Sequence, residues 1–223
     1  MFIKESLSVY NRNLLKIMLI SLVLLLPAQF IVYGWMLYLE EIEAMKYLNI
    51  ISLFLYILLF TVVAPPYIKV ALSDFNDEEI DLKENALLFV KNFGVLFIMA
   101  PVLFLIGLFG SFLLLIPTIL SLGVLFLIPL FLESEESLGQ IIRKTMMVLR
   151  EKYLEMTAYL LFTLSVNILF WYLFTNIVSY FESNILTYII IRILINLIIF
   201  PLFYIVLVRM FHPGLQADRE GYL

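Results

Sequence analysis

Cysteine is absent from this chain of 223 residues, and histidine occurs once, at His212. Without cysteine the chain has no disulfides, thiolate metal sites or cysteine nucleophiles. The lone histidine stands before a proline and a glycine, after the last apolar stretch, which is typical of a helix stop. A single histidine cannot form a catalytic pair by itself. We therefore expect no catalytic residue, no metal site and no cofactor.

Charged residues are also scarce, at 14% of the chain, whereas 64% of the residues are hydrophobic and the mean hydropathy is +1.06. Soluble domains are roughly half apolar and about one quarter charged. The sequence contains no stripe of basic residues of the kind that binds nucleic acid. Because a helix that crosses the bilayer needs about 20 apolar residues, the composition favours one integral membrane domain over residues 1–223.

Long apolar stretches predict an all-α, polytopic transmembrane helix bundle of about six spans. The spans lie near residues 14–36, 48–72, 92–106, 111–132, 154–180 and 186–208. No charge occurs between Phe93 and Leu132, and this length is about twice what one span needs. We expect the chain to reverse at residues 107–111, since Gly107 and Gly110 permit a tight turn.

The first apolar stretch is either a secretory signal peptide or a retained span. Basic residues precede it, as they do in signal peptides. However, it continues past Pro27 to Met36, which is longer than the roughly 7 to 15 residues of a signal core. We interpret it as a retained first span.

The placement of lysine and arginine predicts the orientation, because basic residues in short loops stay preferentially in the cytoplasm. Of the 14 such residues, Lys46 falls on the opposite side and Arg192 lies within the sixth span. The other twelve are Lys4, Arg12, Lys16, Lys69, Lys83, Lys91, Arg143, Lys144, Arg150, Lys152, Arg209 and Arg219. Both termini are thus predicted to be cytoplasmic. An aromatic belt at the outer interface is predicted from Tyr33, Trp35, Tyr38 and Tyr47.

Three amphipathic segments that lead into spans form a weak internal repeat. Residues 5–14 align with 84–93 at an offset of 79, and 144–153 follow at a further offset of 60. The repeat predicts three helical hairpins, each opened by a helix on the inner leaflet; ordinary juxtamembrane charge is the alternative. The basic residues expected to face headgroups are Arg12, Lys16, Lys91, Arg143, Lys144, Arg150 and Lys152.

Residues 113–117, 127–133 and 137–145 resemble the membrane domain attached to some bacterial glycerophosphodiester phosphodiesterases, and the related uncharacterised YciC-like and YesL-like families. In those families two prolines, an acidic residue and an amphipathic helix ending in serine recur. The corresponding residues here are Pro117, Pro129, Glu133 and Thr145, with Thr118 in place of the expected glycine and Thr145 in place of the serine. The resemblance implies a six-helix bundle without an established catalytic role, since the phosphodiesterase chemistry belongs to a separate soluble domain.

Arg192 lies deep in a predicted span, where a charge costs roughly 2.5 to 3.5 kcal/mol. Its candidate partners are Glu43, Glu182, Gln29, a backbone carbonyl and a lipid phosphate. Asn196 shares its helical face at i+4, and Asn167 lies near the middle of the fifth span. We predict a polar cluster inside the bundle. It is either a ligand or headgroup site, or interhelical hydrogen bonding with Arg192 reaching the outer surface. The cluster consists of Gln29, Asn167, Arg192 and Asn196.

No carboxylate lies deep in a predicted span, which disfavours proton- or sodium-coupled transport and a membrane-embedded lipid enzyme. We therefore predict a non-enzymatic accessory or scaffold protein of the bacterial inner membrane, whose partners are the lipid bilayer and a membrane protein or a second copy of the chain. The alternative is a transporter or exporter of a small amphiphile or lipid-like compound, which would protect the cell against a membrane-active agent.

Overall fold

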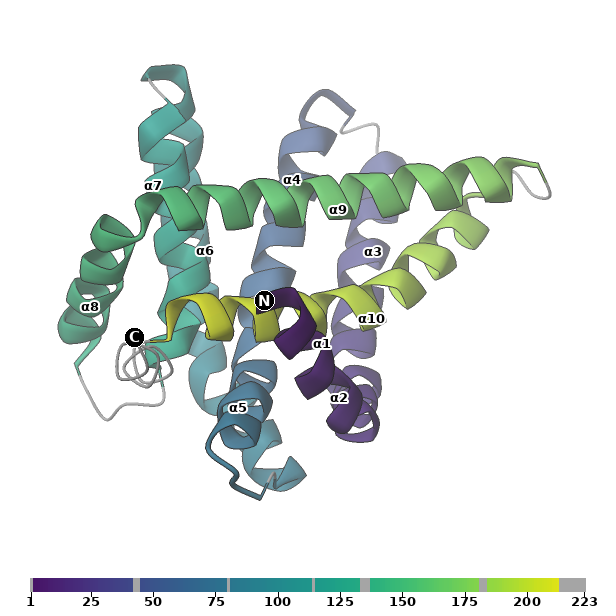
Figure 1. The fold of residues 1–223 in the computed structure, drawn as a ribbon. Coiled ribbons are helices and arrows are strands. Elements are labelled where there is room, and N and C mark those ends of the chain that lie inside the picture. Colours follow the sequence, from purple (N-terminus) through teal and green to yellow (C-terminus); the bar gives the residue numbers. More distant parts are fainter. Residues whose placement is uncertain are drawn as a thin grey trace.

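The computed structural model describes residues 2–41, 45–79, 81–113, 115–132, 137–180 and 184–212. Over these residues the chain is helical and contains no strand, so the all-α class is confirmed (Figure 1). The elements are α1 (Phe2–Arg12), α2 (Leu14–Ile20), the π-helix η1 (Ser21–Leu25), α3 (Leu26–Glu41), α4 (Met45–Val62), α5 (Ala64–Phe75), α6 (Leu82–Leu113), α7 (Leu115–Leu127), the 3-10 helix η2 (Ile128–Phe131), α8 (Leu138–Glu151), α9 (Tyr153–Ser179) and α10 (Ile185–Phe211).

Five helical stretches in the described part of the chain are long and apolar enough to cross a membrane. They are Leu14–Leu39, Ile50–Phe75, Leu82–Gly110, Tyr153–Ser179 and Ile185–Phe211, and each overlaps a predicted span. The remaining predicted span, 111–132, coincides with a shorter apolar helix at Thr118–Phe131. This helix falls short of the roughly 20 residues that cross a bilayer, so the arrangement of six spans in three hairpins stays a prediction.

The reversal predicted at residues 107–111 is wrong, because α6 runs without a break to Leu113 and α7 begins at Leu115. Gly107 instead allows these two helices to approach closely. A Cβ atom on Gly107 would lie 2.5 Å from Ser121 Oγ, and Thr118 Oγ1 donates a hydrogen bond to the Gly107 carbonyl at 2.9 Å. Small residues at a helix interface have this function in apolar surroundings.

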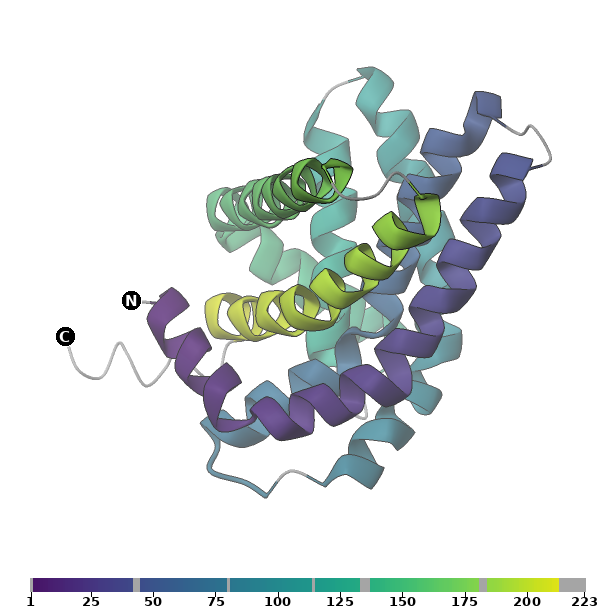
Figure 2. The same cartoon turned by 90° about the vertical axis from the view of Figure 1, so that its right-hand side faces the viewer.

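The helix α10 lies at the centre of the molecule. It packs against α1, α5 and α9, and also contacts α3. Its side chains Phe200, Phe203, Tyr204 and Phe211 are among the largest that are fully buried. Together with α9, it runs across α3, α4, α6 and α7 (Figures 1 and 2). The pair α9 and α10 therefore lies across the other long helices rather than parallel to them.

A proline in α10 creates a contact between distant helices. Pro201 lacks an amide hydrogen, so the Leu197 carbonyl four residues earlier loses its helical donor. Ser21 Oγ donates to that carbonyl at 3.4 Å and lies 2.8 Å from the Tyr67 hydroxyl. Because an unpaired backbone group in an apolar interior costs several kcal/mol, this serine compensates for the proline.

Candidate functional site: a polar cluster between four helices

The four residues predicted to form a polar cluster lie on three helices: Gln29 on α3, Asn167 on α9, and Arg192 and Asn196 on α10. Arg192 Nη2 donates to Asn167 Oδ1 at 2.5 Å. Asn196 Nδ2 donates to Gln29 Oε1 at 2.8 Å. The structure thus brings the four residues together as two hydrogen-bonded pairs.

Tyr56 on α4 joins the two pairs, and sequence reasoning missed it. Its hydroxyl accepts a hydrogen bond from Arg192 Nε at 2.6 Å and one from Asn196 Nδ2 at 2.7 Å. The hydroxyl of Tyr33 on α3 donates to the same oxygen at 3.1 Å. One signal was available, since a tyrosine within an apolar span needs a partner for its hydroxyl once it is buried.

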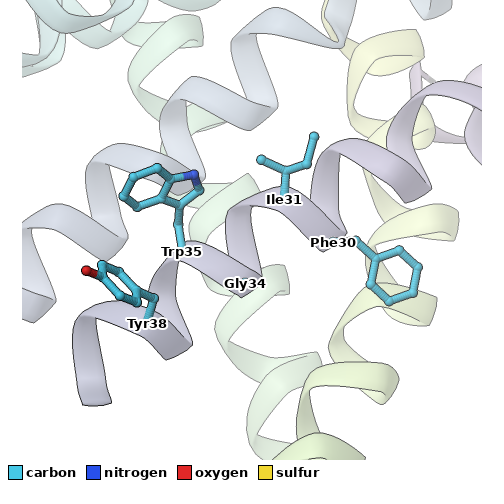
Figure 3. Close-up of a pocket in the computed structure, with 5 residues that line it drawn as sticks. All are labelled: Phe30, Ile31, Gly34, Trp35 and Tyr38. Atoms are coloured by element: carbon cyan, nitrogen blue, oxygen red, sulfur yellow. The ribbon is translucent and has the colours of Figure 1, made fainter. Parts of the chain in front are cut away.

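Tyr33 therefore lies inside the bundle, where 7% of its surface is exposed, although the sequence placed it in an interfacial aromatic belt. Trp35 and Tyr38 on the same helix are exposed and meet edge to face, with ring centroids 6.1 Å apart (Figure 3). The side chain of Tyr47 lies outside the described residues. The interior thus contains one member of the predicted belt.

The guanidinium of Arg192 lies against two aromatic rings. Its central carbon is 5.0 Å from the centroid of Tyr56 and 4.9 Å from that of Trp171 on α9. Such cation–π contacts contribute about 0.5 to 2 kcal/mol each. Within the described residues its hydrogen-bond partners are neutral. The acidic candidates Glu43 and Glu182 lie outside the described residues.

Some polar atoms of the cluster have no hydrogen-bond partner among the described residues. They are Gln29 Nε2, Asn196 Oδ1 and Arg192 Nη1. Gln29 and Asn196 are fully buried, so each unpaired group costs about 1 to 3 kcal/mol. The cluster therefore offers unpaired hydrogen-bond donors, an unpaired acceptor and the positive charge of Arg192.

Two of the basic residues predicted to face headgroups also make contacts at helix ends. Arg12 Nη2 pairs with Asp74 Oδ2 at 2.5 Å, close to the end of α5. Lys152 Nζ donates to the Met210 carbonyl at 3.3 Å, where a cation complements the C-terminus of α10. Lys16 is half-buried. The side chains that are exposed are those of Arg12, Lys91, Arg143, Lys144 and Arg150.

A further ion pair and a hydrogen bond fix α1 and the residue after it to the ends of other helices. Arg209, in the last turn of α10, bonds Glu5 Oε2 through Nε at 2.7 Å and lies 4.9 Å from the Phe75 ring centroid. Asn13 Nδ2 donates to Asp74 Oδ1 at 2.5 Å. The N-terminal helix and the C-terminal end of α10 therefore lie on the same side of the molecule.

The outward face of α3 shows how polarity is distributed (Figure 3). Phe30, Ile31, Trp35 and Tyr38 are exposed, whereas Gln29 on the same helix is buried. A helix at the surface of a water-soluble protein shows the opposite pattern. Polar groups inside and apolar groups outside suit an apolar solvent.

These features define a class: a helical protein whose described part has five helices long and apolar enough to cross a membrane. Comparison with protein-family models, with curated proteins and with solved structures finds no match. The resemblance to six-helix families therefore stays a prediction. Of the residues that carry it, Pro129 lies in η2 and Thr145 is buried in α8, while Glu133 and the side chain of Pro117 lie outside the described residues.

Proposed function

We propose that the protein is a non-enzymatic integral protein of the bacterial inner membrane, which acts as an accessory or scaffold component through lipid or protein partners. The supporting observation is that the charged side chain of Arg192 makes contacts between helices. Its guanidinium donates to Tyr56 and Asn167 and lies against Trp171, so it joins α10 to α4 and α9. An arginine committed to contacts between helices favours a structural role over a path for a solute.

The proposal retains six membrane-crossing segments in three hairpins, with both termini in the cytoplasm. The lengths of the five apolar helices support it. So do the ion pairs Glu5–Arg209 and Arg12–Asp74, which gather several of the basic segments at one side. Basic residues gathered on one side are what the preference for cytoplasmic lysine and arginine requires.

The helix α8 is proposed to lie along the inner leaflet or against a partner. It buries Ile141, Thr145 and Leu149, which follow one another at intervals of four residues. Arg143 and Arg150 are exposed. A helix with one packed face and basic exposed residues suits anionic headgroups or an acidic partner surface.

Cross-linking in intact membranes, followed by purification, tests the accessory role. We expect a reproducible cross-linked product, which is either a partner protein or an oligomer of the chain. The double variant Arg143→Glu with Arg150→Glu should weaken it, because charge reversal opposes an anionic partner. Lys83→Glu, an exposed lysine at the start of α6, is the matched control. Repeated recovery of the uncross-linked monomer from wild type would contradict the proposal.

A transporter or exporter of a small amphiphile is the second candidate, favoured by an apolar groove between α9 and α10. Reconstitution into liposomes separates the two. A carrier would accelerate efflux of an amphiphilic dye, and Arg192→Ala would abolish that efflux in a folded protein. If the protein has the accessory role, neither wild type nor the Arg192→Ala variant changes the permeability of the liposomes to the dye. Arg192→Ala then lowers only the thermal stability of the protein.

A further inference from the structure

An apolar groove of about 210 Å³ lies between α9 and α10. On α9 it is lined by Phe162, Val166, Phe170 and Phe174, whose spacing of four residues places them in one row along the helix. Phe203 is among the residues that line it from α10. The groove is therefore elongated and follows the helix axes.

The chemistry of the lining restricts the ligand. The groove is lined by aromatic and aliphatic side chains, and the lining contributes no polar surface. Its volume is below the about 300 to 1,000 Å³ of sites for drug-sized molecules. A narrow groove without polar groups suits a hydrocarbon chain better than a compact polar solute.

One end of the groove lies next to positive charge. Ile3 of α1 belongs to the lining at this end, and the following residue, Lys4, has an exposed side chain. Val206 lines the groove on α10, and the Met210 carbonyl one turn further along accepts a hydrogen bond from Lys152 Nζ. Figures 1 and 2 show α1 beside the C-terminal part of α10. Lys4 thus directly follows a lining residue in the sequence, and Lys152 contacts the turn of α10 that follows the groove.

We propose that this groove binds one acyl chain of an anionic phospholipid, with the phosphate beside Lys4. The apolar row accounts for the chain, and the amines account for the negative headgroup. This inference rests on the proposed function, because it requires the protein to lie in a membrane. It adds the class of lipid that the proposed accessory protein would bind. The chain enters from the level of α1, which the sequence places at the headgroups.

Native mass spectrometry of detergent-purified protein tests the site, with phosphatidylglycerol and phosphatidylcholine added at equal concentration. Wild type should retain one phosphatidylglycerol after the remaining lipid has been washed away. Ile198 lines the groove on α10, so Ile198→Trp fills the groove and should lower this occupancy about tenfold. Leu194→Trp is the matched control, since Leu194 and Ile198 both lie on α10 and are both 54% exposed, but Leu194 does not line the groove. Lys4→Glu should abolish the preference for phosphatidylglycerol.

Equal occupancy in the Ile198→Trp and Leu194→Trp variants would overturn the proposal, and so would equal retention of the two lipids by wild type. A second protein that copurifies with wild type, is lost with Ile198→Trp and excludes lipid would also overturn it. These results are distinguishable from failure of the accessory role. The lipid count is read on the isolated protein, whereas cross-linking and dye efflux are read in membranes.

Discussion

At the scale of single residues, the contacts of Arg192 are comparable in energy to the cost of placing its charge in a membrane. That cost is roughly 2.5 to 3.5 kcal/mol on insertion scales. Hydrogen bonds from a charged donor contribute about 1.5 to 3 kcal/mol each, and Arg192 makes them to Tyr56 and Asn167. The two aromatic contacts add to this. The arginine is therefore accommodated by neutral groups of the described chain.

Tyr56→Phe should lower the free energy of unfolding by about 1 to 3 kcal/mol, because it leaves Arg192 Nε without its acceptor and removes one of the acceptors of Asn196 Nδ2. Thermal unfolding in mild detergent measures the change. Tyr38→Phe, on the exposed face of α3, is the matched control and should unfold as wild type does. Equal stability of the two variants would show that the hydroxyl of Tyr56 does not hold the cluster together.

His212 predicts a dependence of stability on pH. A charged imidazole would be favourable at the C-terminus of α10, but burial outweighs this and lowers the pKa of His212 below its usual value. The unfolded chain therefore binds the proton more readily than the folded chain. Stability is complete above the unfolded pKa of about 6.5 and falls as the pH drops below it.

The variant His212→Gln should reduce the loss of stability between pH 7 and pH 5. Melting temperatures of the variant and of wild type across this range provide the measurement. Parallel curves would mean that the loss of stability arises from groups other than His212.

At the scale of helices, hydropathy was sufficient to locate the long elements, because each apolar stretch of adequate length became a helix. It was insufficient for the boundary between α6 and α7. A glycine such as Gly107 is compatible with a chain reversal and also with close packing of two helices. Which of the two occurs depends on Ser121, whose side chain lies next to Gly107 only in the folded protein. The sequence shows the glycine but not its neighbour.

Gly107→Ala should lower the free energy of unfolding by about 1 to 3 kcal/mol, since its new methyl group would overlap Ser121 Oγ. Gly94→Ala, in the same helix, places its methyl group where no atom lies within 4 Å. It should raise the stability by up to about 1 kcal/mol, because alanine favours the helix. Thermal unfolding of both variants and of wild type in the same detergent measures these changes. A stabilising Gly107→Ala would argue against close packing of α6 on α7.

At the scale of the whole molecule, the path of α9 and α10 across the other helices could not be predicted. Hydropathy gives the length of a helix but not its direction, which depends on packing against neighbours. The four predicted members of the polar cluster were easier to find in the sequence, because amide and charged side chains are rare in apolar stretches. Tyr56 was harder to recognise, since tyrosine is also common at membrane interfaces.

The cluster also sets an order of events during synthesis. Gln29 and Asn196 are separated by 167 residues, so Gln29 is made long before its hydrogen-bond partner. At about 5 to 20 residues per second, the delay is on the order of 10 to 30 s. During that interval Gln29, Tyr33 and Tyr56 lie in a nascent chain that lacks α10. A chain truncated before Arg192 would leave Gln29 without Asn196 and Tyr56 without its donors Arg192 and Asn196, and we expect membrane proteases to degrade such a fragment.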